Sequence, residues 1–180
     1  MRKLSSVVAV FLLCAVLFSC GREEDADLTV PSPVPVTAAP RSLEEGKPVP
    51  DFHYRLLDDS EGYLSDHIGK PVVLFFWTTQ CSPCVSDMPK IQSLYEKYSD
   101  KVWFFAVSSG EEMDAVQEYV VDNGIMFPVV FDGKSEIQKL LGIDSLPQSA
   151  IIGSGGIVSK RVSGSRSEEE YSELIEDALK

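Results

Sequence analysis

The chain has 180 residues and a formal net charge of −12 at pH 7, with 44% hydrophobic and 24% charged residues. This length fits about one domain, and the composition is that of an ordinary globular protein rather than a disordered one. An acidic protein of this kind is repelled by nucleic acid and by anionic lipid headgroups, so we exclude nucleic-acid binding.

The N-terminus has the parts of an export signal. A basic start, Met1-Arg2-Lys3, precedes the apolar run Val7–Phe18. That run is too short to cross a bilayer as a helix, which needs about 20 residues, but it fits a secretory signal. It ends in Leu17-Phe18-Ser19-Cys20, which resembles a bacterial lipobox. We therefore expect residues 1–19 to be a cleaved signal peptide and Cys20 to be lipidated. The alternatives are a plain signal peptide or an uncleaved anchor.

Residues 20–45 are expected to form a disordered tether behind the lipidated cysteine. Acidic residues at its start are followed by four prolines, and large apolar residues are few. Such a segment cannot bury enough surface to offset the entropy of ordering it. The remaining residues, 46–180, are enough for one domain whose core needs no disulfide staples.

Strands and helices alternate through this domain. In chain order we expect a hairpin over 52–64, a buried strand over 72–77, a helix over 83–98, a strand over 102–107, a helix from about 112, a strand over 127–131, a helix over 135–141, a hairpin over 148–162 and a final helix through 179. Alternation implies parallel crossovers, and the late hairpin adds an antiparallel edge. The sequence thus predicts an α/β fold with a central mixed sheet flanked by helices.

Two helix starts have the spacing of a capping box, in which a hydroxyl and an acid three residues later satisfy each other's backbone N–H groups. Ser109 with Glu112 is expected to begin the helix near 112. Ser167 with Glu170 is expected to begin the last helix.

Cys81 and Cys84 have the spacing C-x-x-C, directly after a buried strand and at the start of a helix. This arrangement indicates a thioredoxin-like redox motif. The helix N-terminus stabilises a thiolate, which is the nucleophile, and Pro83 suits the first helical turn. We expect Cys81 to be outermost and to attack, and Cys84 to be shielded and to resolve the mixed disulfide.

Two other roles for the cysteine pair have to be weighed. A structural disulfide that closes so small a loop stabilises the fold by only about 2 kcal/mol or less, so a purely structural role is unfavourable. A zinc site needs about four ligands. The only histidines, His53 and His67, lie near the N-terminal hairpin. We therefore expect neither a metal nor a cofactor.

The sequence also resembles the TlpA/ResA-like thioredoxins, over essentially all of residues 46–180. The resemblance rests on the blocks Gly46–Phe52, Leu64–Asp66, Gly69–Leu74, Phe76–Cys84, Met88-Pro89, Phe127–Val129, Gly142–Pro147 and Gly156-Ile157. It implies a thioredoxin-like fold with an N-terminal β-hairpin extension. It also implies a cis Leu146–Pro147 bond facing the cysteines, beside which an extended substrate segment would pair with the backbone.

Several positions around the motif depart from the family or tune it. Gln80 replaces the tryptophan commonly found before the first cysteine, and Phe75 stands where thioredoxins bury an aspartate. Asp87 matches a family position that often carries glutamate, so it is our candidate proton acceptor. The alternative for Asp87 is a solvated first-turn acid that complements the helix dipole. Ser82 and Pro83 would tune the redox potential; Trp77 is expected to pack in the core.

The family consists of membrane-tethered thiol–disulfide oxidoreductases of bacterial envelopes. The resemblance implies that this protein reduces disulfides in exported cysteine-containing proteins, with cytochrome c maturation as one use, and draws electrons from a membrane or envelope thiol–disulfide donor. The alternatives are an oxidase or isomerase, a non-catalytic surface lipoprotein, or a thiol peroxidase. Thr78 lies three residues before Cys81, as in peroxidases, but position 74 is leucine where they have proline.

Overall fold

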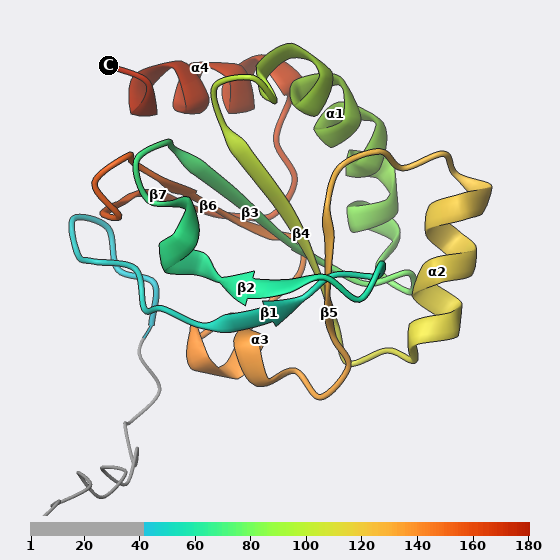
Figure 1. The fold of residues 1–180 in the computed structure, drawn as a ribbon. Helices are drawn as coiled ribbons and strands as arrows, with labels where there is room; N and C mark the ends of the chain where they lie inside the picture. The colour runs from blue at the N-terminus through green and yellow to red at the C-terminus, as the bar shows by residue number, and fades with distance from the viewer. Residues whose placement is uncertain (1–41) are drawn as a thin grey trace, which may run out of the picture. The chain divides into compact units, whose positions relative to one another are not determined.

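A five-stranded mixed sheet runs through the centre of the protein (Figure 1). The computed structural model describes residues 42–180, and the expectations for residues 1–41, including the signal peptide and Cys20, lie outside the described residues. The strand order is β5-β4-β3-β6-β7. The bounds are β3 Val72–Trp77, β4 Trp103–Ser109, β5 Val129–Asp132, β6 Gln148–Ile152 and β7 Val158–Ser163.

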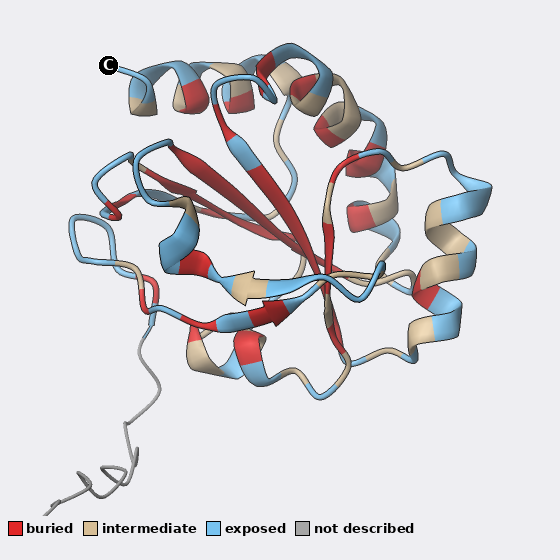
Figure 2. Ribbon diagram, in the orientation of Figure 1, coloured by how far each residue is buried: buried red, intermediate tan, exposed pale blue. Residues whose placement is uncertain are grey.

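The central strand, β3, is buried along its whole length, as the red ribbon in Figure 2 shows. It runs parallel to β4 on one side and antiparallel to β6 on the other. A strand covered on both faces is expected to be apolar at every position rather than at alternate ones, and this one reads Val-Val-Leu-Phe-Phe-Trp. The predicted mixed sheet and the predicted bounds of this strand are both confirmed.

Three helices cover one face of the sheet, namely α1 (Ser82–Tyr98), α2 (Met113–Asp122) and α4 (Glu168–Ala178). Their apolar stripes pack on alternate residues of β3, among them Phe75 and Trp77. The N-terminus of α4 carries the predicted capping box, because Ser167 accepts from the N–H of Glu170 and the Glu170 side chain accepts from the N–H of Ser167.

The other face is covered by shorter elements. These are the hairpin of β1 (His53–Arg55) and β2 (Glu61–Tyr63), a 3-10 helix over Leu64–His67, and α3 (Glu136–Leu140). The predicted N-terminal hairpin is therefore confirmed, except that Leu64 begins the 3-10 helix and is buried instead of ending the strand.

The predicted capping box at Ser109 is wrong. Strand β4 continues through Ser109, and Gly110 then turns the chain with a φ of +74°. The helix α2 begins only at Met113, with Glu112 as its N-cap. The hydroxyl of Ser109 instead donates to Asp132 Oδ2 at 3.3 Å, because the ends of β4 and β5 are adjacent.

The packed domain begins earlier than the predicted boundary at residue 46. Leu43 is 1% exposed, and its N–H donates to the carbonyl of Leu141 at 3.0 Å. The chain then pairs with the turn between β6 and β7, since Gly46 and Val49 donate to the carbonyls of Val158 and Gly156. Residues 42–45 thus belong to the domain rather than to the tether. Among residues 42–180, no helix combines the length and apolarity needed to cross a membrane.

Candidate active site

Cys81 and Cys84 form a disulfide at the junction of β3 and α1, with their Cα atoms 5.2 Å apart. Cys81 is the N-cap of α1, and its Sγ accepts the backbone N–H of Cys84 at 3.2 Å. Pro83, in the first turn, has no N–H to leave unpaired there. The sulfur of Cys81 therefore lies at the positive end of the helix dipole, where a thiolate is stabilised.

The two cysteines differ in their access to solvent. Cys84 is 0% exposed, whereas Cys81 is partly exposed and its neighbours Gln80, Ser82 and Pro83 are exposed. A partner molecule can thus approach Cys81 but not Cys84. Among residues 42–180, no three His, Cys, Asp or Glu side chains gather as metal ligands.

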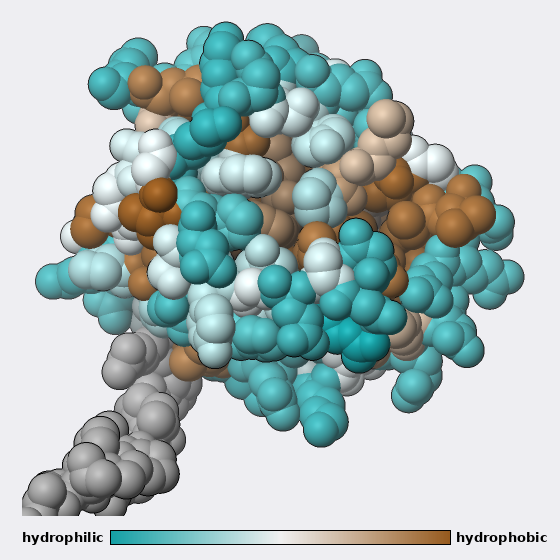
Figure 3. Space-filling view, in the orientation of Figure 1, coloured by the Kyte–Doolittle hydropathy of each residue, from teal (hydrophilic) through white to brown (hydrophobic). Residues whose placement is uncertain are grey.

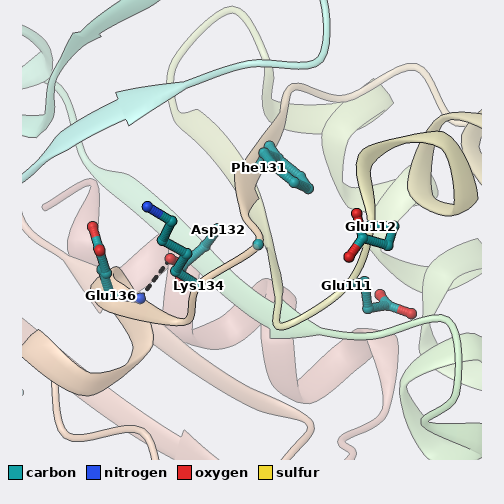
Figure 4. A pocket seen from close by; sticks show the side chains of 7 residues that line it. Glu111, Glu112, Phe131, Asp132, Lys134 and Glu136 are labelled. Carbon is teal, nitrogen blue, oxygen red and sulfur yellow. Dashed lines mark hydrogen bonds between the residues drawn. The ribbon is translucent and has the colours of Figure 1, made fainter.

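The loop before Cys81 is held by Glu111, which the sequence analysis did not single out. The N–H of Thr79 donates to both carboxylate oxygens of Glu111, at 3.1 and 2.9 Å, and the Thr79 hydroxyl donates to Oε1. Ser108 donates to Oε2 at 3.2 Å. Figure 4 shows Glu111 at the edge of a pocket that Asp132 also lines.

A signal for this contact exists in the sequence. β3 and β4 are parallel neighbours, so the loops that follow them lie at the same edge of the sheet. An acid placed directly after β4 therefore faces the loop that carries the cysteines.

The Leu146–Pro147 bond is cis, as the resemblance predicts. Gln148, the next residue, pairs with Phe76 of β3, so Pro147 lies at the same end of the sheet as Cys81. The carbonyl of Pro147 accepts the N–H of Gly164 at 2.9 Å. Within residues 42–180, the backbone N–H and C=O of Leu146 have no hydrogen-bond partner, which leaves them free to pair with an extended segment.

Asp87 is 0% exposed, so its interpretation as a solvated acid is wrong. It lies one helical turn beyond Cys84 and shares a face of α1 with it. Its Oδ1 accepts from Lys90 Nζ at 2.7 Å and from the hydroxyl of Ser165. Its Oδ2 is buried and has no partner within residues 42–180. A buried carboxylate is costly unless it is paired, and Lys90 supplies the pairing charge.

Lys90 could have been found from sequence, because an acid and a lysine three residues apart meet on a helix. Ser165 could not, because it comes from the loop before α4 and no local pattern marks it.

The position where thioredoxins bury an aspartate holds Phe75 in this protein. Phe75 is 1% exposed at that position and pairs with Ser149 of β6. The hydroxyl of Ser149 is 3.0 Å from the hydroxyl of buried Tyr171. Burial raises the pKa of Tyr171, and the negative charge of Asp87 raises it further. Asp87 is therefore the buried carboxylate whose charge acts on Tyr171.

Trp77 is 0% exposed and packs on Tyr119 of α2, with ring centroids 5.3 Å apart, so it has the core position that was predicted. A groove between α1 and α2 starts at Val85, the residue after Cys84. Its lining combines apolar Val85, Met88, Pro89, Tyr119 and Ile125 with polar Gln92, Ser93, Glu96 and Asn123. Figure 3 shows apolar surface over α2, the helix to which the exposed Val121 belongs.

A thioredoxin-like sheet, a C-x-x-C disulfide capping a helix and a cis-proline beside it define a thiol–disulfide oxidoreductase. The chain belongs to the AhpC/TSA family, which it matches over residues 46–161.

Similar proteins agree with this class. The chain is 36% identical to thiol-disulfide oxidoreductase ResA of Bacillus thuringiensis, covering 74% of this chain and 78% of the relative. It is 35% identical to ResA of Bacillus subtilis, covering 78% and 80%. A crystal structure described as thiol:disulfide interchange protein DsbE from Chlorobium tepidum has a TM-score of 0.72 and 28% identity, covering 77% of this chain and 100% of that one. The resemblance to ResA-like thioredoxins is thereby confirmed.

Proposed function

We propose that this protein reduces disulfides in exported proteins of a bacterial cell envelope, the apoproteins of c-type cytochromes among them. The observation that carries the proposal is the unequal burial of the pair: Cys81 is partly exposed at a helix N-terminus, and Cys84 is buried behind it. One sulfur is accessible to a partner, and the other is held ready to displace that partner.

The reaction transfers two electrons in two exchanges. The thiolate of Cys81 attacks one sulfur of a substrate disulfide, forming a mixed disulfide and releasing one substrate thiolate. The thiolate of Cys84 then attacks Cys81 Sγ, forming the Cys81–Cys84 disulfide and releasing the second substrate thiolate. The substrate is reduced and the protein is oxidised. A thiol–disulfide donor of the membrane or envelope restores the two thiols.

Asp87 is proposed to accept the proton of the Cys84 thiol before the second exchange. It is buried one turn away on the same helix face, and its Oδ2 is not engaged within residues 42–180. Lys90 and Ser165 occupy Oδ1, so Oδ2 is the oxygen left to receive that proton.

Substrate binding is proposed at Leu146 and Pro147. The unpaired backbone groups of Leu146 support addition of an extended substrate segment, as in strand addition. The groove between α1 and α2 supports apolar contacts for residues flanking the substrate cysteine. Exposed Gln80, Ser82 and Pro83 surround the approach to Cys81.

The proposed envelope location is supported by the N-terminal pattern. A signal peptide over residues 1–19 and lipidation of Cys20 would leave the domain on a tether at a membrane surface. Similarity to bacterial ResA and DsbE proteins supports the same placement.

The redox potential of the Cys81–Cys84 couple, measured by equilibration with thiol buffers, tests the direction of electron flow. A reductant is expected at about −270 mV, the value of thioredoxin, or below. A potential of about −120 mV, that of a strong oxidant, would favour the oxidase or isomerase instead. A pair that stayed oxidised in every physiological reductant would favour a non-catalytic lipoprotein.

A further inference from the structure

Arg161, on β7, contacts both ends of the loop that precedes β6. Its Nη2 donates to the carbonyl of Gly142 at 2.8 Å, and the same group is 3.7 Å from Asp144 Oδ1. Its Nη1 donates to the carbonyl of Leu43 at 3.4 Å. The amide oxygen of Gln148 faces the guanidinium and accepts from its Nε and, at 2.9 Å, from its Nη2.

These contacts enclose the Leu146–Pro147 segment. Gly142 begins the loop that leads to it, and Gln148, which is 0% exposed, follows it directly. One guanidinium therefore fixes the chain on both sides of the backbone groups that are free to pair with a substrate. Through its hydrogen bond to Leu43, Arg161 also links the same loop to the first residues of the domain.

The loop is also restricted from the other side. Gly142 has a φ of +64°, and a Cβ there would lie 3.0 Å from the Cβ of Ser42. The loop thus lies between the N-terminal segment and Arg161. A planar guanidinium can bond several oxygens at once in fixed directions, whereas a lysine ammonium cannot reproduce this geometry.

We propose that Arg161 is a positioning residue, which holds the loop of residues 142–148 in the conformation that binds an extended substrate. The inference rests on the proposed function, because it assigns substrate docking to Leu146 and Pro147. The side chain of Arg161 bonds to Leu43, Gly142 and Gln148 and lies near Asp144, so its contacts do not involve either cysteine. Its removal should therefore impair docking of peptides and leave the sulfur chemistry of the Cys81–Cys84 pair unchanged.

The first experiment measures the loop without any substrate. Amide hydrogen exchange is followed in the oxidised protein at Gly142 and Ile143, whose N–H groups donate to the carbonyls of Lys139 and Gln138. Arg161→Gln should speed their exchange about tenfold, because hydrogen bonds to a charged group are lost. Exchange in α1 should not change. Unchanged exchange at both loop amides would overturn the proposal.

The second experiment separates docking from chemistry. The reduced protein is reacted with a peptide containing one disulfide and with the small disulfide dithionitrobenzoate. Arg161→Gln should raise KM for the peptide about tenfold, with kcat and the rate with the small disulfide nearly constant. A merely structural role would lower both rates together, and that result, or an unchanged KM, would contradict the inference.

Lys160→Gln is the matched control, because it removes the adjacent cation, whose partner is exposed Glu45. It should leave loop exchange and KM as in the wild type. Should Arg161→Gln not fold, Arg161→Lys can replace it, because it keeps the positive charge without the planar guanidinium. It should also raise KM for the peptide while leaving the rate with the small disulfide unchanged, but by a smaller factor. A wild-type protein that reduced no peptide would refute the proposed function, while hydrogen exchange would still decide the role of Arg161.

Discussion

Glu111 accepts the backbone N–H of Thr79 with both of its carboxylate oxygens, so the loop after β4 is bonded to the loop that ends at Cys81. Glu111→Ala would leave this partly buried N–H without its acceptor. The free energy of unfolding should fall by about 1–3 kcal/mol, measured by urea denaturation of the oxidised protein. Glu112→Ala is the control, since this exposed side chain makes no capping hydrogen bond, and it should change stability by less than about 0.5 kcal/mol. Equal effects of the two variants would refute the role of Glu111.

The two cysteines should have unequal roles. Cys84→Ser leaves Cys81 able to attack but nothing to resolve the adduct, so mixed disulfides with envelope proteins should accumulate. Cys81→Ser should trap few partners, because the remaining thiol is 0% exposed. Alkylation of the reduced wild type should label Cys81 well before Cys84. If Cys84 is labelled first, attacker and resolver are exchanged.

Replacement of the buried acid should affect the second exchange selectively. Asp87→Asn should slow release of the product from the mixed disulfide about a hundredfold, the contribution typical of a positioned proton acceptor. Formation of the mixed disulfide should change little, because the Cys84 thiol takes no part in that step. Asp114→Asn, an exposed acid in the first turn of α2, is the control. An unchanged resolution rate would eliminate Asp87 as proton acceptor.

Lipidation should depend on Cys20 alone. Cys20→Ala should move the protein from the membrane fraction to the soluble fraction and abolish incorporation of labelled fatty acid, because the anchor comes from buried acyl methylenes. Cys14→Ala, within the apolar run, should leave both unchanged. Membrane retention of the Cys20→Ala protein would argue for an uncleaved anchor.

The stability of the domain should depend on the protonation of Asp132. Burial raises the pKa of this carboxyl above its usual 3.8, although the N–H groups that begin α3 oppose the effect. Between 3.8 and the higher folded value, the folded state binds more protons than the unfolded state, so the free energy of unfolding falls as pH rises.

The test is urea denaturation of the wild type and Asp132→Asn across the acid range. The stability of the wild type relative to the variant should be greatest below pH 3.8, the pKa of Asp132 in the unfolded state. It should decrease as pH rises from there to the higher pKa of the folded state. Exposed Asp122→Asn should follow the wild type. A relative stability that instead increased with pH would show that the hydrogen bonds to the carboxylate outweigh its burial.

Features set by local sequence could be predicted well. β3 was recognisable because burial on both faces requires an unbroken apolar run, and α1 because its apolar stripe follows a strand and a proline. The cysteines at the start of α1 follow from these two elements. The cis bond before Pro147 came from the resemblance, not from any local pattern.

Features that depend on contacts distant in sequence could not be predicted in the same way. Arg161 and Gly142 meet because β7 passes beside the loop before β6, and Asp87 meets Ser165 through the packing of α4 on α1. The error at Ser109 has the same origin, since its hydroxyl found Asp132 on a neighbouring strand rather than a helix to cap.

The pairing of Gly46 and Val49 with the β6–β7 turn has a consequence for orientation. That turn follows Ile152, which lies opposite Val72 at the first residue of β3, whereas Cys81 follows the last. The point where the chain enters the sheet and the redox pair are thus separated by the length of a six-residue strand, or about 20 Å. On the disordered tether that the sequence predicts, an enzyme attached to a surface through its N-terminus can present Cys81 to proteins arriving from the aqueous side, and can rotate to exchange electrons with a donor embedded in that surface.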